Sequence, residues 1–334
     1  MNMVLGKIVF GLLLALAFGQ TARAEIDTLR LGVQPGLTYL PFAIVQHEGL
    51  IEKATAAAGA PGLKVVYNRF SGGPAMNDGL MSDNIDIAST GIPSYLTLWA
   101  KARGRMTVRA LMSYGYIPIG LVTRNPAVKT IGDFTDKDRI ALPGVKTSLQ
   151  AIFLGIAAEK LYGPGQSGRF DSLTVTRAHP DGMAALMGNT EINSHFTIPP
   201  YLNLELKRSD IHLVATAIDI VGSPVSNGVI YLTERFYKEN PRTVGAVYEA
   251  VKQAVALIQA DPKRAAEMYL KISEERTPVA EIEAMIKAPG SVYDIAPHGT
   301  VAIAKFLHRT GMIGSEPKDW KELFLPYVHG EDGS

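Results

Sequence analysis

Residues 63–81, LKVVYNRFSGGPAMNDGLM, contain the succession that decides the fold. A β-rich run from Leu63 to Phe70 leads into the small-residue turn Ser71-Gly72-Gly73-Pro74, and a helical segment extends from Ala75 to Met81. Proline is favoured in the first turn of a helix, because the N–H that it lacks would have no partner there. A strand, a tight turn and a helix in direct order predict the repeating unit of an α/β protein.

The same unit recurs along the chain. Strands followed by a turn and a helix are predicted at residues 29–33, 85–88 and 139–142. Strand-like runs at 108–113 and 119–123 flank Tyr114-Gly115-Tyr116, where we expect the chain to cross into a second lobe, and it returns around residues 221–225. We therefore predict a two-lobed α/β protein, with residues 25–114 and 222–334 in the first lobe and residues 115–221 in the second.

The C-terminal third is predicted to be mostly helical. Three helix starts are indicated by a polar capping residue followed by proline, at Asn240-Pro241, Asp261-Pro262 and Thr277-Pro278. In the first of these helices an apolar stripe repeats with helical period, and we expect it to pack in the core against the sheet of the first lobe. Its members are Val244, Val247, Val251, Val255 and Ile258.

The N-terminus has the order of a secretory signal peptide. Lys7 precedes an apolar stretch from Ile8 to Phe18, and Ala22-Arg23-Ala24 provides an A-x-A cleavage site. The apolar stretch is too short for a membrane span, which takes about 20 residues. We expect cleavage after Ala24, and because Glu25 and not cysteine follows, we expect a freely diffusing periplasmic protein without a lipid anchor.

Composition excludes several kinds of chemistry. The chain has no cysteine, which rules out disulfides, thiolate catalysis and Cys-ligated metals. Its formal net charge of +1 provides no field suited to nucleic acid. The seven histidines show no metal-binding spacing, and no phosphate-loop or dinucleotide fingerprint opens a helix. We expect no metal, no cofactor and no catalytic residue.

The turns that follow the strands are the first candidates for a binding site. A helix start presents unpaired N–H groups and the positive end of the helix dipole, so several such turns facing one cleft would favour an anion. All α/β proteins have such turns and most of these turns bind nothing, so each one alone is a weak signal. The candidates are Ser71, Gly72, Gly73, Ser89, Thr90, Gly91, Thr147 and Ser148.

Aromatic residues near the strand ends and crossovers are the second set of candidates. Rings that face a cleft would add apolar area for an organic ligand, although burial in the core is the commoner fate of any one ring. We expect two or three of six to contact ligand, among Tyr39, Phe42, Tyr114, Tyr116, Phe196 and Tyr201. His195, which follows a predicted strand, is a further candidate, with a structural role as the commoner alternative.

Taken together, the motifs resemble a known family. The runs Leu31-Gly32-Val33-Gln34-Pro35-Gly36, Phe70-Ser71-Gly72-Gly73-Pro74-Ala75-Met76 and Asp86-Ile87-Ala88-Ser89-Thr90-Gly91 are similar to those of the nitrate/sulfonate/taurine family of ABC-transporter solute-binding proteins. The segments Lys129-Thr130-Ile131-Gly132-Asp133-Phe134 and His179-Pro180-Asp181-Gly182-Met183-Ala184 match as well. The resemblance covers essentially the whole mature chain.

The resemblance implies a type II-like periplasmic-binding-protein fold with two hinge crossovers, which closes on a ligand and docks on a membrane permease. A monomer that binds a small molecule is expected, with ABC permease as its protein partner. By resemblance, ligand contacts come from Gln34 to Tyr39, Ser71 to Gly73, Ser89 to Gly91, Thr147, Ser148, His195 and Phe196.

Two departures leave the ligand open. No Arg or Lys except Lys146 sits in the candidate turns, and Thr197-Ile198-Pro199-Pro200-Tyr201 stands where some family members have Trp-Asp-Pro-Tyr. We expect an organic acid with an apolar or aromatic body, while sulfonate and nitrate remain possible through helix ends alone.

Two alternative functions stay open. One is an enzyme on the same fold, although the thiamine-pyrimidine synthases and desulfinases that resemble this family use cysteine motifs. The other is a sensor that docks on a receptor.

Overall fold

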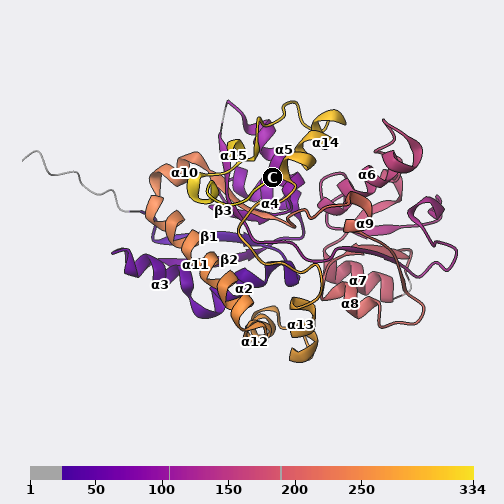
Figure 1. Cartoon of the computed structure of the whole chain (residues 1–334). Coiled ribbons are helices and arrows are strands. Elements are labelled where there is room, and N and C mark those ends of the chain that lie inside the picture. Colours follow the sequence, from indigo (N-terminus) through magenta and orange to yellow (C-terminus); the bar gives the residue numbers. More distant parts are fainter. Residues whose placement is uncertain (1–24, 105, 189) are drawn as a thin grey trace, which may run out of the picture.

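The computed structural model describes residues 25–104, 106–188 and 190–334, so the predicted signal peptide lies outside the described residues. Two separate five-stranded sheets, each covered by helices, form two lobes side by side (Figure 1). The fold class expected from the recurring strand–turn–helix unit is therefore confirmed. None of the helices in the described residues is long and apolar enough to cross a bilayer.

The first sheet has the order β2-β1-β3-β10-β4. Its strands are β1 (Thr28–Val33), β2 (Lys64–Arg69), β3 (Ile87–Thr90), β4 (Val108–Ser113) and β10 (Val229–Thr233). β1 runs parallel to β2 and β3, whereas β10 lies antiparallel between β3 and β4. The carboxyl ends of β1 and β3 consequently meet at one edge of the sheet, where Gln34 and Thr90 are joined by a hydrogen bond.

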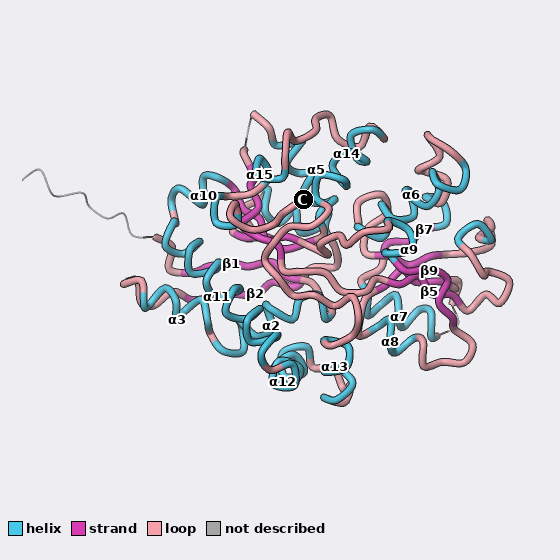
Figure 2. Tube along the Cα trace, viewed as in Figure 1, coloured by secondary structure: helices cyan, strands magenta, loops and turns pink. Residues whose placement is uncertain are grey.

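The second sheet has the order β7-β6-β8-β5-β9. Its strands are β5 (Gly120–Thr123), β6 (Ile140–Leu142), β7 (Thr174–Thr176), β8 (Ser194–Thr197) and β9 (His212–Thr216). β6 runs parallel to β7 and β8, and β5 is antiparallel to both of its neighbours. The chain enters this sheet between β4 and β5 and leaves it between β9 and β10, which makes two crossovers between the lobes (Figure 2).

Most of the helices belong to the first lobe. They are α2 (Leu40–Glu48), α3 (Leu50–Ala57), α4 (Gly73–Met81), α5 (Ile92–Ala102), α10 (Glu234–Glu239), α11 (Pro241–Ala260), α12 (Pro262–Ser273), α13 (Val279–Ile286), α14 (Thr300–Arg309) and α15 (Trp320–Leu323). Four more accompany the second sheet: α6 (Leu149–Tyr162), α7 (His179–Met187), α8 (Tyr201–Glu205) and α9 (Ala217–Val221). Short 3₁₀ helices occupy Leu37–Tyr39, Ile131–Asp133, Asp171–Leu173 and Pro326–Val328.

The helix starts predicted from proline are confirmed for α11 and α12, which begin at Pro241 and Pro262. The apolar stripe of α11 is buried as expected, but the helix packs mainly on α2 and α3. The sequence from Thr147 to Leu161 predicts a long amphipathic helix in the second lobe. Instead, α6 is apolar on most of its surface, because it is covered by α9 and also by α5 of the first lobe.

The two lobes touch across the cleft between them. The Leu37 N–H donates to the Pro199 carbonyl at 2.9 Å, and the Ser94 hydroxyl donates to the Thr147 carbonyl at 3.0 Å. A β-carbon added to Gly72 would lie 2.2 Å from the Pro143 carbonyl oxygen, so only glycine fits between these two backbones. These contacts describe a closed arrangement of the lobes.

Candidate functional site

Four helix N-termini, two from each lobe, meet at one small cavity in the cleft. Gly73 starts α4, Gly91 precedes α5, Ser148 precedes α6 and His179 starts α7, and all four residues line this cavity of about 40 Å³. The Ser148 hydroxyl accepts the Ala151 N–H, whereas the other three helix starts have no side-chain cap. Unpaired N–H groups and four positive dipole ends thus face the same space, which favours an anion.

The walls of this cavity, which we call the head pocket, are polar but uncharged. No Lys, Arg, Asp or Glu is among its lining residues within the described chain. Gln34 donates to Thr90 Oγ1 at 2.8 Å, and Thr38 Oγ1 is buried with no hydrogen-bond partner among the described residues. The volume holds about three water molecules, at roughly 10–15 Å³ each. It therefore suits a compact headgroup stabilised by dipoles.

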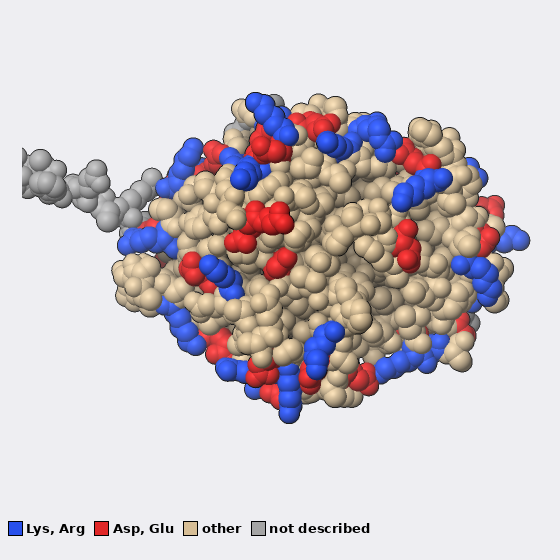
Figure 3. Space-filling model, viewed as in Figure 1, with Lys and Arg blue, Asp and Glu red and all other residues tan. Residues whose placement is uncertain are grey.

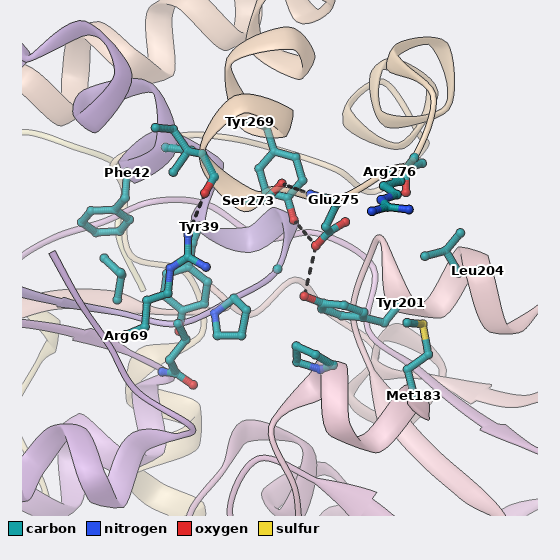
Figure 4. A pocket seen from close by; sticks show the side chains of 18 of the residues that line it. Tyr39, Phe42, Arg69, Met183, Tyr201, Leu204, Tyr269, Ser273, Glu275 and Arg276 are labelled. Atoms are coloured by element: carbon teal, nitrogen blue, oxygen red, sulfur yellow. Dashed lines mark hydrogen bonds between the residues drawn. The ribbon is translucent and has the colours of Figure 1, made fainter. Parts of the chain in front are cut away.

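A second, larger cavity adjoins the head pocket. It has a volume of about 610 Å³ and shares Gln34 and Tyr39 with the smaller one (Figure 4). We call it the tail cavity. Much of its wall is apolar or aromatic, and both lobes contribute. These side chains are Val33, Phe42, Tyr67, Met183, Tyr201, Leu204, Tyr269 and Ile272. A cavity of this size and lining suits the body of an organic molecule.

The charged groups of the tail cavity were not among the residues expected from the sequence. Arg69 donates to the Ile272 carbonyl at 2.6 Å, and Lys207 pairs with Glu281 at 2.5 Å. Arg276 lines the cavity as an exposed side chain, and Glu275 is half-buried. The charged side chains that line the tail cavity are therefore mostly cationic, in contrast to the uncharged cleft that the turns alone predict.

Glu275 links the lobes across the tail cavity. Its Oε1 accepts hydrogen bonds from Tyr201 of α8 at 3.1 Å and from Tyr269 of α12 at 3.0 Å (Figure 4). Burial raises the pKa of the Glu275 carboxyl, and the two phenol hydrogen bonds offset part of that rise. Since Tyr201 belongs to the second lobe while α12 packs on α2 of the first, one of these bonds forms only when the lobes close.

Removing that bond should weaken closure. We expect Tyr201→Phe to lower ligand affinity about 3- to 10-fold, since one hydrogen bond contributes roughly 0.5–1.5 kcal/mol. Tyr269→Phe is the matched control, because it removes the bond to the same oxygen from within the first lobe. Isothermal titration calorimetry on both variants checks this, and equal losses for the two would contradict a role for Tyr201 in closure.

Six of the residues predicted for the site line the head pocket. They are Gln34, Tyr39, Gly73, Thr90, Gly91 and Ser148. Gln34 and Tyr39 follow β1, Thr90 ends β3, and the other three stand at helix starts. Five of them converge at one edge of the first sheet, as expected from the α/β pattern, and Ser148 faces them from the second lobe.

The structure places the other predicted residues elsewhere. Ser71 is exposed and lines neither cavity, and Gly72 contacts the opposite lobe. The Ser89 hydroxyl donates to the Gly32 carbonyl at 2.7 Å inside the first lobe. Tyr114 is buried behind Tyr39, with ring centroids 5.6 Å apart. None of these four residues lines the head pocket or the tail cavity.

Four further candidates also lie outside both cavities. Tyr116 lines a separate cavity of about 320 Å³ beside the crossovers, and Thr147 lines another, of about 350 Å³. His195 and Phe196 are fully buried in β8, because every residue of that strand is covered. His195 therefore has the structural surroundings that we weighed as the commoner alternative.

Sequence reasoning missed two groups of cleft residues. The first comprises head-pocket residues beside the predicted turns: Ser94, Ile119, Pro143, Leu149, Gln150, His179, Ile198 and Asn227. His179 was within reach, because His179-Pro180 is a visible helix start. The second is the segment 269–278, which the fold returns to the cleft from the C-terminal third and which has no local signal of binding.

The surface gives no sign of a nucleic-acid partner on the face that Figure 3 shows. Lys and Arg side chains are spread around its rim and alternate with acidic ones. Within the described residues, no group of three His, Asp or Glu side chains is placed to hold a metal ion. The cleft is therefore the candidate site for a small molecule in the described chain.

Comparisons with known proteins point the same way. No family model matches the chain. A curated protein of Escherichia coli (strain K12), named as an aliphatic sulfonates-binding protein, is 24% identical over 290 residues, which cover 84% of this chain and 82% of that protein. The resemblance inferred from the motifs is thus confirmed by a relative of the expected kind.

Solved structures share the fold. The alkanesulfonate-binding protein SsuA of Xanthomonas axonopodis pv. citri, bound to MOPS, superposes with a TM-score of 0.68 at 18% identity, covering 88% of this chain and 96% of its own. The periplasmic nitrate-binding protein NrtA of Synechocystis PCC 6803 superposes with a TM-score of 0.57 at 16% identity, covering 78% and 70%. The chain has the periplasmic-binding-protein fold.

Proposed function

We propose that this chain, whose fold and relatives are those of sulfonate- and nitrate-binding proteins, is the periplasmic solute-binding component of an ABC importer. One observation carries the proposal: two helix N-termini from each lobe converge on the uncharged head pocket. A ligand held by both lobes favours the closed state, so binding is converted into a change of shape. A permease can recognise that change.

The ligand that fits best is an organic anion with an elongated apolar or aromatic body. Its headgroup lies in the head pocket, where helix dipoles and N–H groups stabilise the charge. Its body extends into the tail cavity, past Tyr39 and toward Met183 and Leu204. A sulfonate or a carboxylate meets these requirements. Nitrate would use the head pocket alone and leave the tail cavity filled with water.

Affinity should therefore increase with the length of the ligand. Across 1-alkanesulfonates from ethane- to octanesulfonate, we expect the dissociation constant to fall about 3- to 4-fold per methylene, because burying one CH₂ contributes roughly 0.8 kcal/mol. Calorimetric titration of the series, with nitrate and sulfate beside it, checks this. Equal affinities for nitrate and octanesulfonate would contradict a role for the tail cavity.

Binding without chemistry is the second part of the proposal. After incubation with the protein, the ligand should be recovered unchanged, as judged by NMR of the supernatant. The appearance of a product would favour an enzyme on this fold. Five polar residues of the head pocket can donate hydrogen bonds to an anion, which is what reversible capture needs: Gln34, Thr38, Thr90, Ser148 and Asn227.

Export and partners follow from the same proposal. Glu25, which would become the first residue after cleavage, accepts hydrogen bonds from Thr243 N and Thr243 Oγ1, each at 2.7 Å, and so caps the start of α11. We propose a monomeric protein that docks on an inner-membrane permease. Mass spectrometry of the exported protein should give a chain beginning at Glu25.

A further inference from the structure

A chain of buried polar side chains runs from the head pocket into the second lobe. His179 lines the pocket, and its Nδ1 lies 3.2 Å from His195 Nε2. His195 Nδ1 lies 2.6 Å from Glu205 Oε1. All three side chains are less than a tenth exposed, and a β-carbon at Gly182 would come within 2.6 Å of His195 Nε2, so the packing leaves no room for water there.

The surroundings of Glu205 favour its neutral form. The side chain has an exposed fraction of 0%. Among the described residues its only hydrogen-bond partner is His195, and its Oε2 is buried without a partner. An ionised carboxylate needs several donors when it is buried, whereas a carboxylic acid needs one acceptor. Burial accordingly raises the pKa of Glu205 to about 9 and lowers that of His195 to about 3.

A neutral Glu205 determines the direction of every hydrogen bond in the chain. Its O–H donates to His195 Nδ1, which leaves the proton of His195 on Nε2. That N–H donates to the single lone pair of His179 Nδ1, and the Thr197 hydroxyl oxygen lies 3.3 Å from the same nitrogen. The proton of His179 then lies on Nε2, the nitrogen that faces Gln150 at the pocket wall.

We propose that Glu205 and His195 act as positioning residues that hold His179 in the tautomer with a proton on Nε2, so that His179 donates a hydrogen bond to the anionic headgroup. The opposite tautomer would present a lone pair to an anion and repel it. No charged side chain in the described part of the chain lines the head pocket, and a buried neutral N–H donor supplements the helix ends there.

The neighbours of His179 are compatible with this tautomer. From α6, Gln150 approaches Nε2 at 3.4 Å, which is longer than a strong hydrogen bond, and rotating its carboxamide by half a turn places Oε1 there as an acceptor. From β8 come His195 and Thr197, and from α8 the Tyr201 ring stacks at 6.0 Å between centroids. In the absence of ligand, Gln150 Oε1 thus accepts the hydrogen bond from His179 Nε2–H that the headgroup would accept when it is bound.

Histidine tautomers can be measured directly, in the free protein. Long-range ¹H–¹⁵N correlation spectra of ¹⁵N-histidine-labelled full-length mature chain separate Nε2–H, Nδ1–H and imidazolium forms, and the spectra of His179→Gln and His195→Gln assign the two residues. We expect Nε2–H for both His179 and His195 at pH 7. An Nδ1–H tautomer or an imidazolium at either residue would overturn the inference.

A pair of variants tests the role in binding, with 1-octanesulfonate as probe. In His179→Gln an amide nitrogen can take the place of Nε2, so affinity should stay within about 3-fold of the wild type. In His179→Asn the side chain reaches only the Nδ1 position, and we expect a loss of about 10- to 100-fold, as for a hydrogen bond to a charged group. Equal affinities for the two variants would overturn the inference.

This inference rests on the proposed function, because the Nε2–H of His179 is proposed to donate to the headgroup of an anionic ligand. The two can fail separately. If 1-octanesulfonate does not bind the wild-type protein, the proposed function fails, while the tautomers of His179 and His195 in the free protein still decide the direction of the hydrogen bonds.

Discussion

Replacing Gly72 with alanine is expected to lower ligand affinity about 100-fold or more while both lobes stay folded. The new β-carbon would lie 2.2 Å from the Pro143 carbonyl oxygen, a contact between backbones that no side-chain rotation relieves. Gly72 has an extended backbone, which alanine adopts equally well. The substitution therefore destabilises only the closed state. Coupling between a conformational change and binding commonly changes ligand affinity 5- to 150-fold.

An alanine at this position also separates two effects. Aspartate at position 72 would add a negative charge at the start of α4 and the same steric overlap, so a loss of binding would have two explanations. Alanine adds only the overlap. Gly314→Ala is the matched control, because a β-carbon there meets no atom within 4 Å.

Two measurements check the Gly72 prediction. Calorimetry reports affinity for a sulfonate, and small-angle X-ray scattering with and without ligand reports closure. The variant should remain extended at ligand concentrations that make the wild type compact, with a circular-dichroism spectrum like that of the wild type. Compaction of Gly72→Ala at the same concentrations would show that the Gly72–Pro143 contact does not belong to the ligand-bound state.

Local signals in the sequence were sufficient for the first half of the site. Gln34, Thr90 and Gly91 lie at or just after the ends of strands. In each case the strand, the turn and the start of the helix follow one another directly in the sequence, and an α/β pattern places such turns at one sheet edge. The same reasoning predicts the helix start at Ser148, which lines the head pocket. It works because each helix start depends on a few neighbouring residues, such as a serine cap or a proline.

The rest of the site depends on contacts between distant segments. Tyr269 and Glu275 reach the cleft because α12 packs on α2, more than 200 residues earlier in the chain, and nothing near position 275 indicates a binding role. His195 was a candidate because it follows a strand-like run. Every residue of β8 is buried, so alternation along the strand could not tell a cleft residue from a core residue.

Tyr114 and Phe196 show the same limit for aromatic residues. Both lie where the sequence places them, at a strand end and near a crossover, yet both rings are buried. Tyr39 and Tyr201 have similar positions in the sequence and line the cavities. Whether a ring faces the cleft is decided by the packing of the opposite lobe, which local sequence does not encode.

Glu205→Gln is expected to stabilise the protein increasingly as the pH rises from 7 to 9. Burial raises the pKa of Glu205 in the folded protein to about 9, whereas in the unfolded chain the carboxyl releases its proton near its ordinary value of 4.5. Between these values the folded state binds more protons, so its stability falls with rising pH, by up to about 1.4 kcal/mol per unit.

His195 does not disturb this pH window. Its pKa in the folded state is lowered to about 3 by burial, and the unfolded chain takes up that proton only below its ordinary value of 6.5. Its contribution is therefore lost as the pH falls below 6.5, so that of these two residues only Glu205 changes the stability above pH 7. Glutamine cannot ionise, and its amide can still donate to His195 Nδ1.

Urea denaturation at pH 7, 8 and 9 measures the effect. The difference in unfolding free energy between Glu205→Gln and the wild type should grow by about 1 kcal/mol per pH unit and then level off near pH 9. Glu267→Gln, at an exposed position on α12, is the control and should run parallel to the wild type. A parallel curve for Glu205→Gln would mean that Glu205 is ionised in the folded protein, and the direction of the hydrogen bonds through His195 to His179 would then be reversed.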